Sequence, residues 1–371
     1  MAKLIVTGGG TGGHVFPALE VAREMDRQGC SVEYWGSLRG QESKACDRAA
    51  IEFRGFGSEP LYRLTSVRGL RGVVNLLKAM MKVRRQMEEY RPAAVFSTGG
   101  YASAPVVGSA RKLKIPYVIH EQNVVPGRTN RILGRSAHAV CTVFCSGHEH
   151  FEGTRVIRTG MPIRPEFRSG QAGFGIAQTS ESHRSLILVT GGSQGAQAIN
   201  EAAIATATRM ARHPIHWIHV TGPRHYEAMI ASLGKLGAQN HYTLRAYLDA
   251  PEMAGAMFAS EVAMCRSGAG TLAELAALRK PSLLIPYPHA FGDHQRANAQ
   301  EFVEMGAATM LAESELQPST IESRLMAWIG ESDRIGAAQK ALADWDSPNA
   351  VHEIAKIVME AAGARMVRPQ S

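Results

Sequence analysis

Residues 4–13 read Leu-Ile-Val-Thr-Gly-Gly-Gly-Thr-Gly-Gly, an apolar run that leads directly into a glycine-rich turn. Apolar residues at helical spacing follow, at Ala18, Val21, Ala22 and Met25. A strand, a glycine turn and a helix in this order form the repeating unit of doubly wound α/β folds. Glycines let the N–H groups of such a turn approach an anion at the positive end of the helix dipole. This stretch therefore predicts an α/β domain with an anion-binding turn.

The same plan recurs in the second half of the chain. Residues 187–196 read Ile-Leu-Val-Thr-Gly-Gly-Ser-Gln-Gly-Ala, and a helical pattern follows them. A third version, residues 95–100, ends another predicted strand in the first half. Strand and helix signals alternate along the whole chain. We therefore expect an α/β fold of two Rossmann-like, doubly wound parallel-sheet domains that face each other across a central cleft.

Chain length and prolines indicate where the domains divide. A chain of 371 residues is too long for one average core and fits two domains. Pro162 and Pro165 resist regular structure between the two repeats. We predict domains at 1–162 and 163–345. A last helix, at about 348–362, is expected to begin after Ser347-Pro348 and to pack back on the first domain.

The composition narrows the class of protein. Hydrophobic residues make up 45% and charged residues 20%, as in soluble globular domains. No apolar run reaches the ~18 residues of a membrane span, and the immediate glycine turn leaves no room for a signal peptide. Five cysteines form no paired framework, which indicates reduced thiols. We expect Cys141 and Cys145 to be buried rather than metal-bound.

Positive charge is concentrated in the first half. Residues 1–165 carry 24 Lys and Arg against 13 Asp and Glu, while the remainder carries 17 against 20. This asymmetry indicates an anionic partner for the first half. Aromatic residues are only 6% and do not interleave with the basic ones, so we expect an anionic membrane surface and no nucleic acid.

The first glycine turn also matches a dinucleotide-binding fingerprint. Residues 8–13 fit G-x-G-x-x-G, and Glu33 follows at the expected end of a second strand, a pattern that alone favours NAD. The second glycine turn and His14, directly after the last glycine, weigh against this interpretation. The glycines could also serve helix–strand packing alone, and His14 could be a capping or packed histidine.

Small and polar residues cluster in the second half. A predicted strand at 262–265 is followed by a small-residue turn at 266–271 and a helix with Glu274 in its first turns. The turn can wrap a ligand, and the carboxylate suits ribose hydroxyls; pairing with the helix dipole is the alternative role of Glu274. Residues 293–298 then begin another helix with groups suited to sugar hydroxyls, or form a solvated N-terminus.

Two strings resemble metal sites but lack the right context. Asp344-Trp345-Asp346 has the D-x-D form of metal-dependent sugar transferases, yet it follows an Ala-rich helical stretch. His148-Glu149-His150 lacks the i, i+4 spacing of a helical zinc site. We therefore expect no metal and no other cofactor.

Six segments in order resemble the MurG family of glycosyltransferases. They are GGGTGGHVFP (8–17), STGGYASAP (97–105), HEQN (120–123), GGSQGA (191–196), RSGAGTLAE (266–274) and PYPHAFGDHQRANA (286–299). The family usually shows Gly-Asn-Pro before its linker arginine, and Met161 occupies the middle position here.

The resemblance implies a GT-B fold and an inverting transfer in peptidoglycan synthesis. N-acetylglucosamine would move from UDP-N-acetylglucosamine to the 4-hydroxyl of undecaprenyl-pyrophosphoryl-muramoyl-pentapeptide (lipid I), giving lipid II. The residues it implies for donor binding are Thr11, Gly12, Gly13, Asn123, Arg164, Ser193, Leu248, Ala269, Gly270, Thr271, Leu272, Ala273, Glu274 and Gln295. Tyr101 and His120 would lie on the acceptor side. His14 is the candidate base, because an imidazole titrates near neutral pH; a positioning role is the alternative.

A lipid-linked acceptor requires contact with a bilayer. One apolar stripe at helical spacing comprises Leu70, Val73, Val74, Leu77, Met80 and Met81, with Arg68, Arg71, Lys78, Lys82, Arg84 and Arg85 around it. This pattern is typical of an interfacial basic helix at the cytoplasmic face of the inner membrane, or of an ordinary helix docked on its sheet. Alternatives for the whole chain are a UDP-N-acetylglucosamine 2-epimerase, a soluble-acceptor transferase, an NAD oxidoreductase or a non-catalytic nucleotide-sugar-binding subunit.

Overall fold

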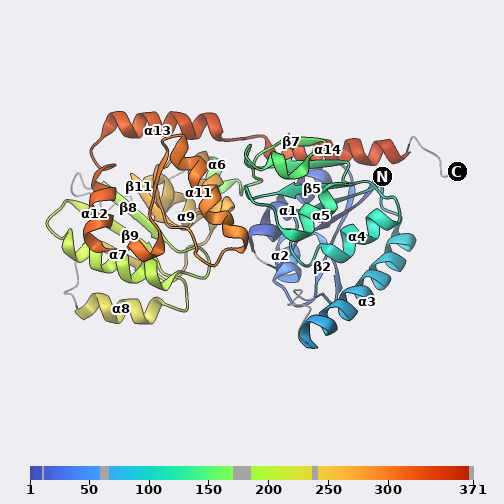
Figure 1. Cartoon of the computed structure of the whole chain (residues 1–371), viewed down its shortest axis with the longest axis horizontal. Coiled ribbons are helices and arrows are strands. Elements are labelled where there is room, and N and C mark those ends of the chain that lie inside the picture. The colour runs from blue at the N-terminus through green and yellow to red at the C-terminus, as the bar shows by residue number, and fades with distance from the viewer. Residues whose placement is uncertain (11, 59–66, 170–184, 236–240, 367–371) are drawn as a thin grey trace. The chain divides into compact units, whose positions relative to one another are not determined.

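A computed structural model of the chain describes residues 1–10, 12–58, 67–169, 185–235 and 241–366 (Figure 1). The chain divides into two compact units: Met1–Ile163 together with Asn349–Ser371, and Arg164–Pro348. We call them the first and the second unit. The expected division, after residue 162, lies one residue before the observed one.

The first unit is built on a parallel sheet with the strand order β3-β2-β1-β4-β5-β6-β7 in the described residues. Its strands are β1 (Lys3–Thr7), β2 (Ser31–Ser37), β3 (Glu52–Phe56), β4 (Ala94–Ser97), β5 (Tyr117–Glu121), β6 (Ala139–Thr142) and β7 (Val156–Arg158). The chain starts in the middle, winds outward to β3, and returns to wind outward the other way from β4. The direction therefore switches between β1 and β4, where ligands bind in folds of this kind.

Helices cover both faces of the first sheet. They are α1 (Gly12–Arg27), α2 (Glu42–Ala49), α3 (Val67–Tyr90), α4 (Ala104–Lys112), α5 (Arg128–Gly134), the 3₁₀ turn η1 (His148–Phe151) and α14 (Ala350–Met366). Residues of α1, α2 and α14 form one buried cluster with Leu4 and Val6. Residues of α3 and α4 form another with Ile5 and Trp35, from the opposite sheet face. The C-terminal helix thus completes the core of the first unit.

The second unit repeats this architecture. Its parallel sheet has the order β10-β9-β8-β11-β12-β13 in the described residues, with β8 in the place of β1. The strands are β8 (Ser185–Thr190), β9 (Ile215–Val220), β10 (Tyr242–Arg245), β11 (Val262–Cys265), β12 (Ser282–Leu284) and β13 (Ala308–Met310). The helices are α6 (Glu166–Ser169), α7 (Gln197–Arg209), α8 (Tyr226–Lys235), α9 (Ala250–Ala259), α10 (Ala269–Ala277), η3 (Phe291–Asp293), α11 (His294–Glu304), η4 (Glu313–Glu315), α12 (Pro318–Met326) and α13 (Ser332–Trp345).

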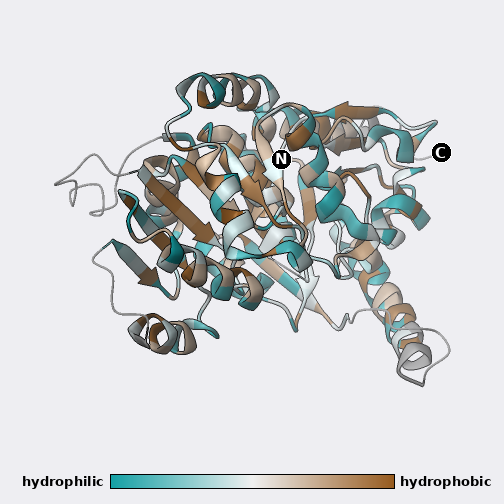
Figure 2. Cartoon of the chain, turned by 60° about the vertical axis from the view of Figure 1, so that its left-hand side comes forward, coloured by the Kyte–Doolittle hydropathy of each residue, from teal (hydrophilic) through white to brown (hydrophobic). Residues whose placement is uncertain are grey.

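The central strands β1 and β8 are apolar in their middle, between polar end residues, because helices exclude water from both faces there. Leu4, Ile5 and Val6 of β1 are buried, as are Ile187, Leu188 and Val189 of β8. Figure 2 shows the strands largely in the brown of hydrophobic residues, whereas the helices carry long hydrophilic stretches. This distribution accounts for the two apolar runs from which the fold was predicted.

The expected last helix is present with other bounds, and two local expectations are wrong. The last helix begins at Ala350, because Pro348 lies in a turn, and it continues to Met366. Glu33 is the third residue of β2 rather than its end, because the strand continues to Ser37. Cys145 is exposed, because it lies beyond the end of β6, while Cys141 within β6 is buried as expected.

Helix α3 does not present its apolar residues as one stripe. The side chains of Arg68, Leu70, Arg71 and Val73 lie outside the described residues. The face that docks on the sheet consists of Ala79, Val83 and Met87. Met80 is half-buried, whereas Val74, Leu77 and Met81 are 50%, 54% and 66% exposed. The stripe expected from the sequence is therefore divided between two faces of the helix.

Candidate active site

In the first unit, two glycine loops meet at the switch point between β1 and β4. The Gly9 N–H donates to the Gly99 carbonyl oxygen at 3.2 Å, which joins the loop after β1 to the loop after β4. The Thr98 hydroxyl donates to the carbonyl oxygen of His14 at 2.8 Å. Gly100 has φ +82°, and a Cβ there would lie 2.0 Å from the Gly9 carbonyl oxygen. Only glycine at this position permits the contact.

Side chains from neighbouring elements hold the first glycine loop from behind. The buried Tyr34 hydroxyl of β2 donates to the carbonyl oxygen of Gly8. The Gly10 N–H donates to Oε1 of Glu42, at the start of α2, at 3.2 Å. The Tyr101 ring packs on Gly10, because a Cβ there would lie 2.7 Å from Tyr101 Cε1. Together with the backbone bond between Gly9 and Gly99, these contacts fix the loop at three successive glycines.

His14 and His120 occupy different environments beside these loops. His14 lies in the first turn of α1 and is partly exposed, with Cδ2 3.3 Å from the position of a Cβ on Gly100. His120 in β5 is fully buried, and its Nε2 lies 2.9 Å from the Gly160 carbonyl oxygen. Burial lowers the pKa of His120 to about 4, with a smaller lowering by His14, although the Gly160 contact acts the other way. His120 is therefore neutral at neutral pH.

Asn123 is positioned by a buried carboxylate. Glu121, the last residue of β5, accepts from the N–H groups of Asn123 at 3.0 Å and Gly127 at 3.1 Å. It also accepts from the side-chain amide of Asn130 at 2.9 Å. Burial raises the pKa of Glu121, and these hydrogen bonds oppose the rise. The carboxylate therefore shapes the loop that carries Asn123.

In the second unit, the loop after β8 meets the loop after β9. Gly195 has φ +75°, and a Cβ there would lie 1.9 Å from the carbonyl oxygen of Thr221. The Gly192 N–H donates to the hydroxyl of Thr190 at 3.2 Å. Ser193 is exposed in the turn between these glycines. The second loop thus has a close backbone approach similar to that at Gly100, made with a different neighbouring strand.

A buried neutral network supports this approach. Asn200 Nδ2 donates to the Thr221 carbonyl oxygen at 2.9 Å, so Asn200 Oδ1 faces Nε2 of His219, 3.0 Å away. Nε2 must then carry the His219 proton, and Nδ1 accepts from the Tyr242 hydroxyl at 2.8 Å. Burial lowers the pKa of His219 to about 3, which keeps the ring neutral. A chain of three side chains therefore runs from β10 to the loop of Gly195.

The start of α10 presents backbone N–H groups at the second switch point. The helix begins at Ala269, so the expected small-residue turn is already helical there. The Leu272 N–H donates to the Gly268 carbonyl oxygen at 3.0 Å, which is the first hydrogen bond of the helix. The backbone N–H groups that come before Leu272 in the helix have no carbonyl partner within it. The Leu272 and Ala273 side chains are buried and the Leu272 N–H is already bonded, so the N–H groups of Ala269, Gly270 and Thr271 are the part of this turn able to meet a ligand.

Two predicted residues of the second unit form an ion pair. Arg164 Nη2 lies 3.0 Å from Oε1 of Glu274, and both side chains are partly buried. Burial raises the pKa of Glu274, while Arg164 lowers it. Gln295 Oε1 accepts from the Tyr287 N–H at 2.9 Å, which fixes the loop before α11. The Leu248 side chain is buried, just before the capping box of α9.

Each unit thus gathers its own set of predicted residues. Gly12, Gly13, His14, Tyr101, His120 and Asn123 lie on elements of the first switch point, and the remaining described ones belong to the second unit. Thr11 lies outside the described residues. Several supporting residues were not predicted from the sequence: Tyr34, Glu42, Thr98, Glu121, Asn200, His219 and Tyr242. Of these, Glu121 and Thr98 had a signal, since they stand within the HEQN and STGGYASAP segments.

The remaining polar strings have structural contacts. Asp346 forms an ion pair with Arg168, and Trp345 Nε1 donates to Glu301 at 2.8 Å. His148 Nε2 lies 2.8 Å from the hydroxyl of Thr142. Glu33, the acid of the dinucleotide fingerprint, is buried and accepts two hydrogen bonds from Arg54. In the residues that the structure describes, no three His, Cys, Asp or Glu side chains gather into a potential metal site.

Known proteins resemble both units. The model of the glycosyltransferase family 28 N-terminal domain matches residues 4–142, and that of the family 28 C-terminal domain matches residues 186–356. A Bacillus licheniformis protein named UDP-N-acetylglucosamine–N-acetylmuramyl-(pentapeptide) pyrophosphoryl-undecaprenol N-acetylglucosamine transferase is 36% identical over 85% of this chain and 86% of its own length. Its namesake from Halalkalibacterium halodurans is 34% identical over 97% of this chain and 99% of its own.

The chain belongs to the MurG family of glycosyltransferases. The crystal structure of MurG from Acinetobacter baumannii matches it with a TM-score of 0.79 at 28% identity, over 97% of this chain and 100% of that one. A Neisseria meningitidis UDP-GlcNAc 2-epimerase bound to UDP-GlcNAc matches with a TM-score of 0.69 at 13% identity, over 97% and 100% of the chains, and shares the fold alone. MurG membership confirms the predicted GT-B fold and N-acetylglucosaminyltransferase class, and the NAD alternative is wrong.

Proposed function

We propose that the chain transfers N-acetylglucosamine from UDP-N-acetylglucosamine to the 4-hydroxyl of lipid I, forming lipid II with inversion at the anomeric carbon. The observation that carries the proposal is the MurG-family match over nearly the whole chain, because the names of those relatives state this donor and acceptor. The geometry of the two switch points supports a division of labour between the units.

The second unit is proposed to hold the donor. The N–H groups at the start of α10 can bind the nucleotide, and the positive end of the helix dipole favours its diphosphate. Glu274 belongs to the same helix, is paired with Arg164 at 3.0 Å and would accept hydrogen bonds from the ribose hydroxyls. Gln295 would contact the sugar through its amide N–H, because Tyr287 already uses its carbonyl oxygen. Ser193 and the backbone of Leu248 would complete the share of the second unit, and Thr11, Gly12, Gly13 and Asn123 of the first unit remain proposed donor contacts.

The first unit is proposed to supply the base. A lone pair of the acceptor 4-hydroxyl oxygen attacks the anomeric carbon of the donor sugar. The proton of this hydroxyl passes to the His14 imidazole, and the bond between the anomeric carbon and the UDP oxygen breaks. The electron pair of that bond leaves with UDP, whose charge the helix end stabilises. Burial keeps His120 neutral, with a pKa of about 4. We assign His120 and Tyr101 to the acceptor side. The neutral His120 ring would position Gly160 there, and the Tyr101 ring would position Gly10.

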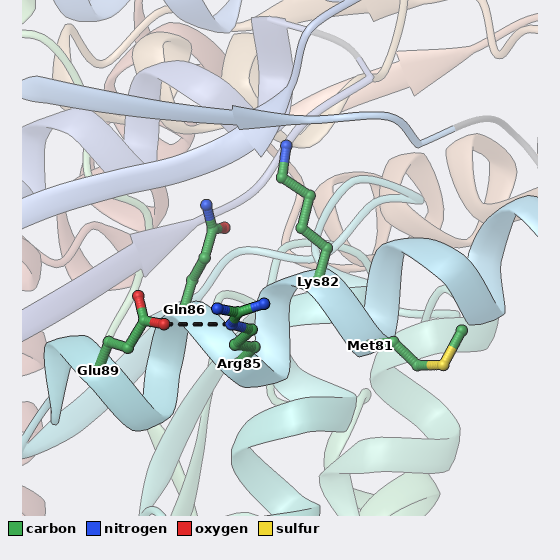
Figure 3. A pocket seen from close by; sticks show the side chains of 5 residues that line it. All are labelled: Met81, Lys82, Arg85, Gln86 and Glu89. Carbon is green, nitrogen blue, oxygen red and sulfur yellow. Dashed lines mark hydrogen bonds and ion pairs between the residues drawn. The ribbon is translucent and has the colours of Figure 1, made fainter.

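Helix α3 is proposed to touch an anionic membrane surface. Its exposed residues Val74, Leu77 and Met81 follow i, i+3, i+7 spacing and form an apolar face. Met81 also lines a pocket together with Lys82, Arg85, Gln86 and Glu89. Figure 3 shows Lys82 and Gln86 pointing the same way from the helix. Arg85 Nε lies 3.3 Å from Oε1 of Glu89. Apolar and basic residues together are typical of interfacial helices.

The expected peripheral position at the cytoplasmic face of the inner membrane belongs to the same proposal. In the residues that the structure describes, no helix combines the length and apolarity needed to span a bilayer. Replacing Leu77 and Met81 together by serine should reduce binding to phosphatidylglycerol-containing vesicles in sedimentation. Ile132→Ser, which changes a 64% exposed residue of α5, is the matched control. Equal binding by both variants would refute the membrane face.

Labelled transfer tests the proposed reaction. Radiolabelled UDP-N-acetylglucosamine is incubated with lipid I and the wild-type chain, with and without EDTA, and lipid-linked product is counted. We expect transfer that survives chelation. Tight UDP-sugar binding without transfer would instead favour the 2-epimerase or the binding-subunit alternative. Release of UDP and N-acetylmannosamine would then indicate the epimerase, and binding without any product would indicate the binding subunit.

A further inference from the structure

A buried carboxylate lies directly behind the first glycine loop. Glu42 is 0% exposed, although it is the first residue of α2, where a carboxylate ordinarily faces water. Its Oε1 accepts the Gly10 N–H at 3.2 Å. Its Oε2 is also buried and has no hydrogen-bond partner in the part of the chain that the structure describes. A buried carboxylate with so few partners is costly, so stability alone does not explain it.

Glycines form the space that holds this carboxylate. A Cβ on Gly9 would lie 2.0 Å from Glu42 Oε1, and a Cβ on Gly40 would lie 1.5 Å from Oε2. A Cβ on Gly36 would lie 3.4 Å from Glu42 Cγ. Two of these glycines stand outside the glycine loop, at the end of β2 and before α2. The space is therefore shaped around the side chain of Glu42 from several elements.

We infer that Glu42 is a positioning residue for the transfer reaction: its carboxylate fixes Gly10 and thereby the loop that leads into His14. Gly10 is held between Glu42 on one side and the Tyr101 ring on the other. A displaced carboxylate would release both Gly10 and the ring that packs on it. The inference rests on the proposed function, because it assigns the loop a role in catalysis.

The expected kinetic signature is a loss of turnover without a loss of donor affinity. The proposed donor residues of α10 lie in the second unit, whereas Glu42 lies in the first. A misplacement of about 1 Å in a reacting group can cost about 10²-fold in rate. Glu42→Ala should therefore lower kcat about 10²-fold. Glu42→Gln keeps an acceptor for the Gly10 N–H and should lose about tenfold or less.

Gly40→Ala provides a second route to the same displacement. The three atoms nearest to a Cβ at Gly40 all belong to the Glu42 carboxylate, so the new methyl group moves that group and leaves the glycine loop untouched. Gly40→Ala should lower kcat in the wild-type chain. It should have no further effect in the Glu42→Ala background, because the atoms it displaces are gone.

Glu33→Gln is the matched control for loss of a buried carboxylate. Glu33 is also buried in the first unit, but it pairs with Arg54 and not with the glycine loop. The experiment measures kcat of lipid I glycosylation, the Kd for UDP and the thermal midpoint for all variants. An unchanged kcat for Glu42→Ala, additive effects with Gly40→Ala, or an equal loss of kcat in Glu33→Gln would overturn the inference.

Two further comparisons distinguish a failure of the inference on Glu42 from misfolding of the variant and from a failure of the proposed function. If Glu42→Ala does not fold, Glu42→Gln and Gly40→Ala decide the matter: kcat equal to wild type in both refutes the role of Glu42. Absence of transfer by the wild-type chain would refute the proposed function itself, before any variant is compared.

Discussion

The two glycine loops begin their units with nearly the same sequence, yet different chemistry supports them. In the first unit, Glu42 and Tyr34 bond the loop directly, one through a carboxylate and one through a hydroxyl. In the second, the neutral chain Tyr242–His219–Asn200 holds Thr221, on which Gly195 rests. A repeated motif therefore specifies the local backbone, while the surrounding side chains decide what each loop is suited to do.

The largest expected effect comes from exchanging the glycine at each close approach. Gly195→Ala and Gly100→Ala both place a methyl group within about 2 Å of a backbone carbonyl oxygen, at 1.9 and 2.0 Å, and both have positive φ. Each should lower kcat/KM at least about 10²-fold. We expect Gly195→Ala to weaken UDP binding in calorimetry and Gly100→Ala to spare it. Equal loss of UDP affinity in both variants would remove the functional distinction between the loops.

Acid should weaken the second unit through His219. Burial lowers its pKa to about 3 from an unfolded value of about 6.5, so the unfolded chain binds more protons between these pH values. The free energy of unfolding should therefore fall as pH drops below about 6.5, by up to about 1.4 kcal/mol per pH unit for this group. The contribution of His219 is fully present above about pH 6.5.

Urea unfolding of wild type and His219→Gln at pH 7.5 and 5 measures this contribution. The variant should be less stable at pH 7.5 but should lose about 2 kcal/mol less than wild type on acidification. His120 of the first unit, with a pKa of about 4, should give a similar acid dependence that His219→Gln leaves in place. An identical pH dependence in both chains would contradict a buried neutral His219.

The smallest expected effect is at the far end of the same network. Tyr242→Phe removes the hydroxyl that donates to His219 Nδ1 at 2.8 Å and leaves that buried nitrogen without this donor. The cost should be about 1 kcal/mol of stability and a few-fold increase in the KM for the UDP-sugar, with kcat unchanged. Tyr34→Phe is the matched change behind the first loop and should lower kcat instead. An increase in the KM for the UDP-sugar in both variants would contradict the functional distinction between the two loops.

The sheets and their loops could be predicted because local patterns carry that information. Apolar strands covered on both faces read as continuous runs, as at 4–6 and 187–189, and glycines mark the close approaches that follow. The supporting residues could not be predicted, because the contact of Glu42 with Gly10 spans 32 positions and follows no periodicity. The network of Asn200, His219 and Tyr242 likewise depends on how β9 and β10 pair.

Some sequence interpretations failed for reasons that the structure makes plain. Helical spacing placed Met80 and Met81 in one stripe, but adjacent residues on a helix point about 100° apart, so one packs inward and the other faces out. Glu33 has the spacing of a ribose-binding acid, yet its strand continues beyond it and Arg54 occupies its carboxylate. In both cases, the spacing of residues along the chain did not determine which residues would pack against these side chains in the folded protein.

The account's central claim is that the first loop carries the chemistry while the second unit holds the donor. The most direct test compares wild type with His14→Ala in two assays: labelled N-acetylglucosamine transfer to lipid I, and calorimetric binding of UDP. We predict that transfer falls by about 10²- to 10⁴-fold while the Kd for UDP stays within about twofold. Undiminished transfer, or UDP affinity lost in parallel with transfer, would contradict the claim.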